Sequence, residues 1–204
     1  MILMTYSWLF YYQDFPSDIF VLMETANVKL VLKGHGWSTS LSPLEFLQYH
    51  NMTKKVLWKI EFPATTDLMF SYKTMQRAIN THAYVNAALR IKVDDNFVVQ
   101  SKPSLVFGGI SKNFIHANNT EELLDGKSLK NIETLKSALQ SLKNEAIPED
   151  DPILASVEYR AHLVQALFYR VSIGTKFTHN CNWNHSYSRS GVLTICDYFD
   201  FIVA

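Results

Sequence analysis

The chain has 204 residues, of which 48% are hydrophobic and 19% charged, and its 19 basic side chains equal its 19 acidic ones. This composition excludes a disordered, collagen-like or low-complexity chain. The balanced charge leaves no overall basic field that would recruit nucleic acid or an anionic membrane. A chain of this size buries roughly 70% of its unfolded surface without disulfides, and two cysteines are too few for a secreted disulfide scaffold.

The first twelve residues are apolar, aromatic and uncharged. They are too short to span a bilayer and lack the basic start and small-residue cleavage site of a signal peptide. We therefore expect no membrane contact and a reducing compartment, which is the cytoplasm or, alternatively, the peroxisome.

The first predicted elements alternate between helix and strand. Residues 15–18 (Phe-Pro-Ser-Asp) predict a helix start, since Pro16 suits the first turn and Ser17 or Asp18 can cap the amides that follow. Residues 27–33 alternate between apolar and polar side chains and predict a strand. The run from Ser42 to about Tyr49 opens with Ser-Pro-Leu-Glu, which predicts a short capped helix.

Residues 54–63 and 68–75 each alternate with period two and predict two strands. Their short connection predicts an antiparallel hairpin in which Leu57 lies nearly opposite Lys73. The expected apolar face of the first strand consists of Val56, Trp58, Ile60 and Phe62. Leu57 would then be an apolar residue on a polar face, which indicates that something covers it.

A second hairpin and then helices are predicted downstream. Residues 85–93 and 97–107 read as its strands, joined by an Asp-Asp-Asn turn. Thr120 can cap a helix that ends at Gly126, and apolar stripes predict helices over 132–146 and 157–171. Strands followed by helices indicate an α+β fold: an antiparallel sheet of about three main strands packed on a C-terminal helical bundle.

Residues 172–204 carry few charges and no sustained period, and we interpret them as a tail foreign to the preceding domain. Cys181 and His185 have the spacing of half a zinc site, which His179 and Cys196 could complete. The alternative is an unpaired polar tail, and the spacing matches no standard zinc pattern. We expect no metal site and no catalytic residue in this chain.

Several motifs, in order, resemble the FAD domain of xanthine dehydrogenases and aldehyde oxidases. They are FPSDIFVLMETANVKL from Phe15, WKIEFP from Trp58, FSYKTMQR from Phe70, RAINTHAYVNAA from Arg77, VFGGI from Val106, EYR from Glu158 and ALFY from Ala166. The run from Arg77 is especially similar to insect aldehyde oxidases. Over about residues 12–171 the chain thus resembles this family of molybdenum hydroxylases.

The resemblance implies a division of the chain. Residues 12–50 correspond to the last helix and strand of an FAD-binding domain of the PCMH type. Residues 51–171 correspond to the CO dehydrogenase flavoprotein C-terminal domain, while 1–11 and 172–204 lie outside the family. The implied activity is that of an oxidoreductase, which passes electrons from a molybdopterin centre through [2Fe–2S] clusters and FAD to oxygen or NAD.

The resemblance also implies three FAD-binding residues: Asp18, Leu57 and Lys73. The Asp18 carboxylate can accept hydrogen bonds from cofactor hydroxyls, although it can equally serve as a helix cap. Leu57 would pack against the ring or the adenine. The Lys73 ammonium would stabilise negative charge on the reduced flavin or its phosphates, the alternative being an ordinary exposed strand lysine.

The family's Gly-rich pyrophosphate loop, iron–sulfur domains and molybdenum domain have no counterpart in this sequence. The FAD site is therefore expected to be partial, and molybdopterin and [2Fe–2S] clusters are not expected to bind to this chain. The simplest interpretation is a fragment, from a truncated product or an incomplete gene model, that is inactive in isolation. Expected partners are FAD, the remaining domains of the parent enzyme and a second copy in a homodimer. The alternative is a flavin-free, non-catalytic interaction module.

Overall fold

The computed structural model describes residues 18–48, 52–75, 83–150 and 155–180. Its strands form two antiparallel sheets, a three-stranded sheet of order β2-β1-β3 and a four-stranded sheet of order β4-β5-β6-β7. In chain order the elements are α2 (Asp18–Thr25), β1 (Lys29–Gly34), β2 (Trp37–Leu41), α3 (Pro43–Gln48), β3 (Val56–Glu61), β4 (Leu68–Met75), β5 (Ala83–Ile91), β6 (Ser104–Gly108), β7 (Ile115–His116), α4 (Asn118–Leu124), α5 (Ile132–Glu145) and α6 (Val157–Asn180). The predicted α+β class is confirmed.

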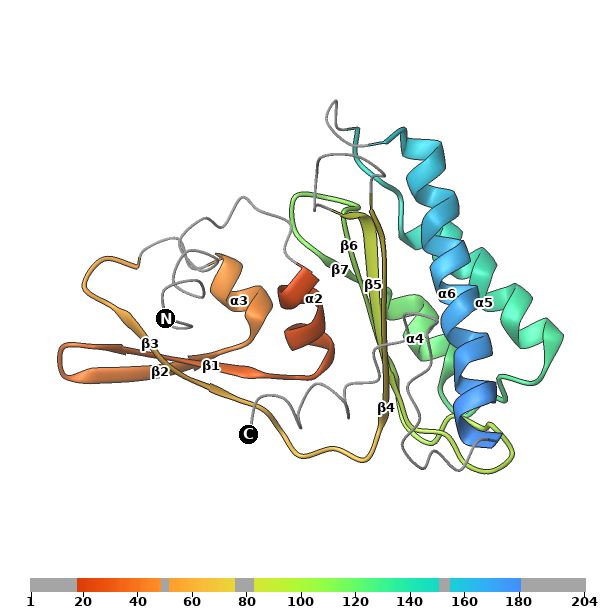
Figure 1. Ribbon diagram of the computed structural model, residues 1–204, viewed down its shortest axis with the longest axis horizontal. Coiled ribbons are helices and arrows are strands. Elements are labelled where there is room, and N and C mark those ends of the chain that lie inside the picture. Colours follow the sequence, from red (N-terminus) through yellow and green to blue (C-terminus); the bar gives the residue numbers. More distant parts are fainter. Residues whose placement is uncertain (1–17, 49–51, 76–82, 151–154, 181–204) are drawn as a thin grey trace.

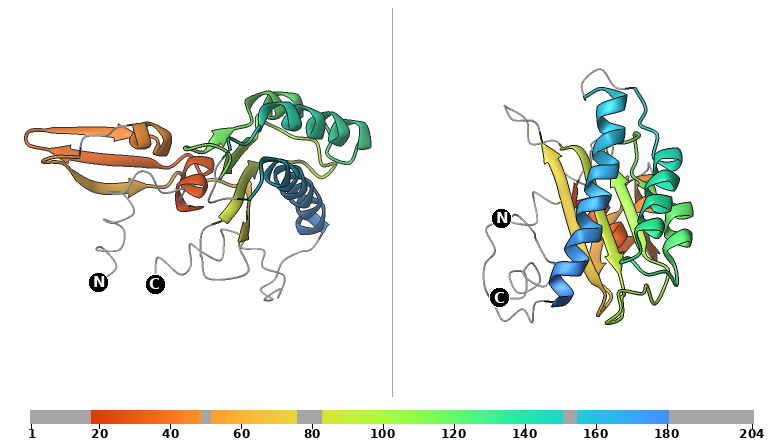
Figure 2. Two further views of the ribbon diagram at one scale, coloured as in Figure 1. Left: turned by 90° about the horizontal axis from the view of Figure 1, so that it is seen from above. Right: turned by 90° about the vertical axis from the view of Figure 1, so that its right-hand side faces the viewer.

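The four-stranded sheet stands between two layers of helix (Figure 1). Helix α2 packs on one face, against β5 and β6, and α4, α5 and α6 lie on the other. The three-stranded sheet extends away from α2 on the side opposite the helical layer, which Figure 2 shows from above. Two apolar clusters follow from this arrangement, one on each face of the four-stranded sheet.

The predicted hairpin between residues 54–63 and 68–75 is wrong. Both segments are strands, but β3 pairs with β1 and β4 pairs with β5. Leu57 therefore lies opposite Leu32, and Lys73 lies opposite Asn86. Because Pro63 cannot donate to a strand ladder, the connection after β3 leaves the first sheet and carries the chain to the second.

The predicted apolar face of β3 is also wrong, because β1 and β3 are joined with a bulge. The register shifts between Val31 and Leu32, so that Leu57 and Ile60 both lie opposite buried leucines of β1. An extra residue in one strand reverses the alternation of faces beyond it. Trp58, which was expected on the apolar face, is 60% exposed.

Helix α3 begins as its sequence predicts. The Glu45 backbone N–H donates to Ser42 Oγ (3.1 Å), and the Ser42 N–H donates to Glu45 Oε2 (2.6 Å). This reciprocal pair is a capping box. The hydrogen bond from the Ser42 backbone holds the pKa of Glu45 below its ordinary value.

The second hairpin is confirmed in part. Strand β5 alternates, with Val85 and Leu89 in the apolar cluster on the side of α6 and with Asn86 and Ala88 facing α2. The return strand is shorter than predicted, since β6 covers Ser104–Gly108 and the earlier part makes two isolated bridges, Val99 with Val93 and Val98 with Ser128.

The helical layer differs from the prediction at two ends. Thr120 does not cap α4 but lies inside it, where its hydroxyl donates to Glu145 Oε2 (3.2 Å). Helix α6 continues to Asn180, past the predicted end near Val171. Near its start the buried Arg160 donates to the carbonyl oxygens of Gly109 and Glu149 and so joins α6 to the loops before it. None of the helices in the described ranges is long and apolar enough to cross a membrane.

Candidate functional site

Two of the three predicted site residues meet at the N-terminal end of α2. Lys73 Nζ lies 2.8 Å from Asp18 Oδ2, and Asn86 Nδ2 donates to Asp18 Oδ1 at 2.8 Å. Lys73, Asn86 and Gly108 occupy paired positions on β4, β5 and β6. They form one row across the sheet, with Asp18 above it. We call these four residues the Asp18 cluster.

The Asp18 cluster is open on one side. The Lys73 side chain is 45% exposed and that of Asp18 is 29% exposed, whereas Asn86 is only 4% exposed beneath them. A carboxylate offers about four lone-pair sites, so two bonds leave Asp18 able to accept more. Its place in the first turn of α2 is favourable for a negative charge. The cluster can therefore present one anion and one cation side by side to a ligand.

The third predicted residue, Leu57, lies on the other sheet. It is partly buried and packs against the apolar cluster built from α2, β1 and α3. What covers Leu57 on its core side is thus this chain's own interior. Among the contacts of the described residues, none joins Leu57 to the Asp18 cluster, so the structure brings together only Asp18 and Lys73.

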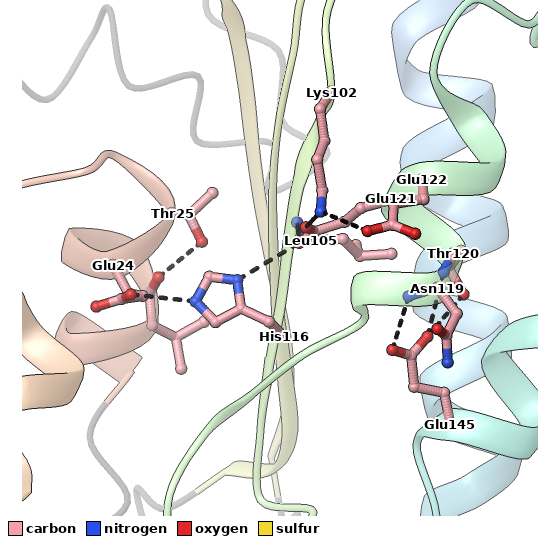
Figure 3. A network of polar contacts seen from close by, with 11 residues as sticks. Glu24, Thr25, Lys102, Leu105, His116, Asn119, Thr120, Glu121, Glu122 and Glu145 are labelled. Atoms are coloured by element: carbon pink, nitrogen blue, oxygen red, sulfur yellow. Dashed lines mark hydrogen bonds and ion pairs between the residues drawn. The ribbon is translucent and has the colours of Figure 1, made fainter.

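A second polar cluster lies near the other end of α2 and was not predicted. His116 Nε2 is 3.1 Å from Glu24 Oε1, and His116 Nδ1 is 3.4 Å from Glu121 Oε1. Lys102 Nζ lies 3.7 Å from Glu121 Oε2. Figure 3 shows His116 reaching from the sheet between α2 and α4, with a carboxylate on either side. We call these residues the His116 cluster.

The electrostatics of the His116 cluster favour a cationic imidazole. Hydrogen bonds to Glu121 and then Glu24 raise the pKa of His116 to about 9, although burial acts in the opposite direction. At neutral pH both ring nitrogens therefore carry protons and both donate to carboxylates. A histidine held in this way cannot accept a proton, so it serves as a link between α2 and α4 rather than as a general base.

The carboxylates of the His116 cluster are also used within the chain. Glu121 Oε1 accepts the buried backbone N–H of Leu105 (2.7 Å), and Glu24 Oε2 accepts that of Leu44 (3.0 Å). Over the described residues, no group of three or more His, Cys, Asp or Glu side chains could hold a metal ion. Cys181 and His185, considered above as half a zinc site, lie outside the described residues.

Residues 70–174 match the family model of the CO dehydrogenase flavoprotein C-terminal domain. This range is just over half of the chain, and it includes most of β4 and all of β5 and β6, with the row that lies under Asp18. The chain belongs to this flavoprotein domain family. The predicted resemblance to molybdenum hydroxylases is thereby confirmed.

Curated relatives of this flavoprotein domain are xanthine dehydrogenases. The enzyme of Blastobotrys adeninivorans is 29% identical over 166 residues, which cover 76% of this chain and 12% of the relative. Xanthine dehydrogenase 1 of Arabidopsis thaliana is 27% identical over 146 residues, which cover 67% of this chain and 10% of the relative. The chain thus spans about an eighth or less of the length of these relatives. The particular similarity to insect aldehyde oxidases stays a prediction.

Solved structures share the fold of this flavoprotein domain. Quinoline 2-oxidoreductase from Pseudomonas putida 86 superposes with a TM-score of 0.71 and 18% identity, covering 83% of this chain and 59% of that one. A carbon monoxide dehydrogenase from Hydrogenophaga pseudoflava gives a TM-score of 0.68 and 17% identity, covering 82% and 58%. The likeness extends beyond the matched family range, since each superposition covers more of the chain than residues 70–174.

Proposed function

We propose that the chain supplies one wall of an FAD site in an oxidoreductase of the xanthine dehydrogenase or aldehyde oxidase type. In this proposal residues 12–50 are the end of an FAD-binding domain and residues 51–171 the flavoprotein C-terminal domain. The segments 1–11 and 172–204 lie outside both. The observation that carries the proposal is the Asp18–Lys73 pair, which stands half exposed at the edge where α2 meets β4.

The residues of the Asp18 cluster fit one part of such a cofactor. The remaining lone pairs of Asp18 would accept hydrogen bonds from ribose or ribityl hydroxyls. Lys73 would place its positive charge against a phosphate or a reduced ring. Bound FAD would supply the redox chemistry by taking electrons from iron–sulfur clusters and passing them to oxygen or NAD.

Leu57 is proposed as a packing contact for the flavin ring or the adenine. Its partial burial in the cluster under β1 and α3 limits that contact to the part of the side chain that faces outward. Loss of this contact is therefore expected to weaken FAD binding less than loss of Lys73 does.

The same proposal assigns the partners of the chain. Iron–sulfur and molybdenum domains would supply the electrons and recognise the substrate, and a second copy would form a homodimer. Molybdopterin and [2Fe–2S] clusters would be held by those other domains. We propose no nucleic-acid or membrane partner and a cytoplasmic location, with the peroxisome as the alternative.

The test is a titration of the full chain with FAD, in which the change in flavin fluorescence gives the dissociation constant. Lys73→Ala is expected to weaken binding by at least 5-fold, because it removes the exposed cation. Lys136→Ala is the matched control, since Lys136 is also a surface lysine in an ion pair, with Glu133 on α5. Equal dissociation constants for the wild type and Lys73→Ala would contradict the proposal.

The second candidate is a flavin-free interaction module. It is favoured by the fact that Asp18 and Lys73 already satisfy each other without a ligand. An absence of FAD binding at millimolar concentration, with an intact fold by circular dichroism, would support it. Under either function we expect the isolated chain to oxidise neither aldehydes nor xanthine, and turnover by the purified chain would overturn that expectation.

A further inference from the structure

We propose that Asn86 is a positioning residue for the Asp18 cluster: it fixes the Asp18 carboxylate so that Lys73 is held at the open edge of the site. The inference rests on the proposed FAD site and adds a residue that touches no cofactor. Asn86 would act through Asp18, and its effect on FAD would follow from that one contact.

The geometry of Asn86 fits this role. Its side chain is 4% exposed, and its Nδ2 donates to Asp18 Oδ1 at 2.8 Å. Lys73 contacts the other carboxylate oxygen, also at 2.8 Å. Because the two oxygens are held by two different partners, the carboxylate cannot rotate without losing one of them. A buried donor below and a partly exposed cation above therefore define where the ion pair stands.

The Oδ1 atom of Asn86 indicates that this residue does not serve to stabilise the fold. Asn86 Oδ1 is buried and has no hydrogen-bond partner among the described residues. A buried acceptor without a partner is unfavourable, whereas an apolar side chain of similar shape at the same place would avoid this cost. Ala88, the next residue on the same side of β5, is apolar and fully buried. A buried polar group without a partner, at a position where the sequence pattern favours an apolar side chain, is typical of functional positions.

Gly108 supports the same interpretation from the neighbouring strand. It is paired with Asn86, and a Cβ atom added there would overlap the Oδ1 atom of Asn86 and lie 2.9 Å from Val21 Cγ2. Gly108 is not among the glycines with positive φ, so its backbone does not require glycine. Glycine is required at this position because the Asn86 amide occupies the space that a side chain would need.

The experiment records the side-chain ammonium signal of Lys73 by ¹H–¹⁵N NMR in the full chain, without cofactor and then with FAD. Asn86→Leu keeps a similar volume but removes the donor. We expect it to broaden or remove the Lys73 signal and to raise the FAD dissociation constant about 3- to 10-fold, since one charge-assisted hydrogen bond is lost. In an Asp18→Ala background the same substitution is expected to change FAD affinity by less than about 2-fold, because the carboxylate through which Asn86 acts is absent.

Thr120→Val is the matched control, because Thr120 is also a buried polar residue but lies on α4, bonded to Glu145. It is expected to leave the Lys73 signal and the FAD affinity unchanged. A Lys73 signal that persists in Asn86→Leu would overturn the inference, as would an equal effect in the presence and absence of Asp18. If no variant binds FAD but the Lys73 signal still depends on Asn86, the flavin function fails and the positioning role stands.

Discussion

Helix α2 carries a cluster of charged side chains at each end, and the two clusters use the same chemistry to different effect. At one end Asp18 contacts Lys73 and Asn86, and at the other Glu24 contacts His116, which in turn contacts Glu121. Both clusters tie α2 to the four-stranded sheet. They differ in how far their polar atoms are satisfied within the chain.

The His116 cluster is closed. Its histidine donates from both nitrogens, and each of its two glutamates also accepts a backbone N–H. The Lys102 ammonium of the His116 cluster is as exposed as that of Lys73, 45% in each case. What distinguishes the Asp18 cluster is spare acceptor capacity on its carboxylate and a buried amide oxygen without a partner among the described residues. A closed network stabilises a fold, whereas an open one leaves groups available for a ligand. The contrast separates a structural ion-pair network from a candidate site.

The largest expected effect comes from breaking the closed cluster at its most buried member. Glu121→Ala leaves the Leu105 N–H and the Nδ1 of His116 without their acceptor. It is expected to lower the free energy of unfolding by about 2–4 kcal/mol. Glu122→Ala is the control, because its side chain is 70% exposed and its ion pair among the described residues is with Lys102. Urea titration should give a change below about 0.5 kcal/mol for this variant. Similar losses for both variants would contradict the comparison.

The pH dependence of stability tests the same cluster. The pKa of His116 is raised from 6.5 to about 9, so its contribution is complete below pH 6.5 and is lost as the pH rises towards 9. Urea midpoints measured between pH 6 and 9 should fall in the wild type, by the equivalent of about 1–3 kcal/mol. His116→Gln should flatten this fall, and an unchanged slope in that variant would count against the assignment.

A smaller effect is expected where Gly108 meets Asn86. Gly108→Ala forces a Cβ onto the Asn86 amide and is expected to cost about 1–2 kcal/mol of stability. In an Asn86→Ala background the cost should shrink, because the amide is no longer in the way. Thermal unfolding of the four proteins measures the coupling, and strictly additive losses would show that the two residues do not act together.

The smallest effect on stability is expected at the open cluster itself. Lys73→Ala removes a partly exposed ion pair with Asp18, which contributes about 0–1 kcal/mol to stability. The same variant is expected to have the largest effect on FAD affinity, whereas the variants of the His116 cluster should bind FAD as the wild type does. If urea unfolding showed that Lys73→Ala lowers the free energy of unfolding by several kcal/mol, Lys73 would be a residue that stabilises the fold, like those of the His116 cluster.

Local signals in the sequence predicted a helix start at residues 15–18 and a capped helix at Ser42. The capping bonds at Ser42 were predictable because they join near neighbours. The pairing of β3 could not be predicted from the sequence. A short connection favours pairing with the next strand, β4, but in the structure β3 pairs with β1, which offers apolar partners. The bulge at Trp58 follows from that pairing and reverses the exposed face. Register across a sheet is a long-range property that alternation alone does not determine.

The candidate site was predictable only in part for the same reason. The resemblance to known flavoproteins implied Asp18 and Lys73 as site residues, and the structure pairs them across 55 positions of sequence. Asn86 has a signal in hindsight, as a polar residue within the apolar run of β5. His116 had none, because its partners Glu24 and Glu121 come from two separate helices that the fold brings to it.

The most direct test of the contrast between the two clusters is an NMR titration of the ¹⁵N-labelled chain with FAD up to millimolar concentration. Our account predicts chemical-shift changes at Asp18, Lys73 and Asn86, with the resonances of Glu24, His116 and Glu121 unmoved. Shifts confined to the His116 cluster, or none at either end of α2, would contradict it.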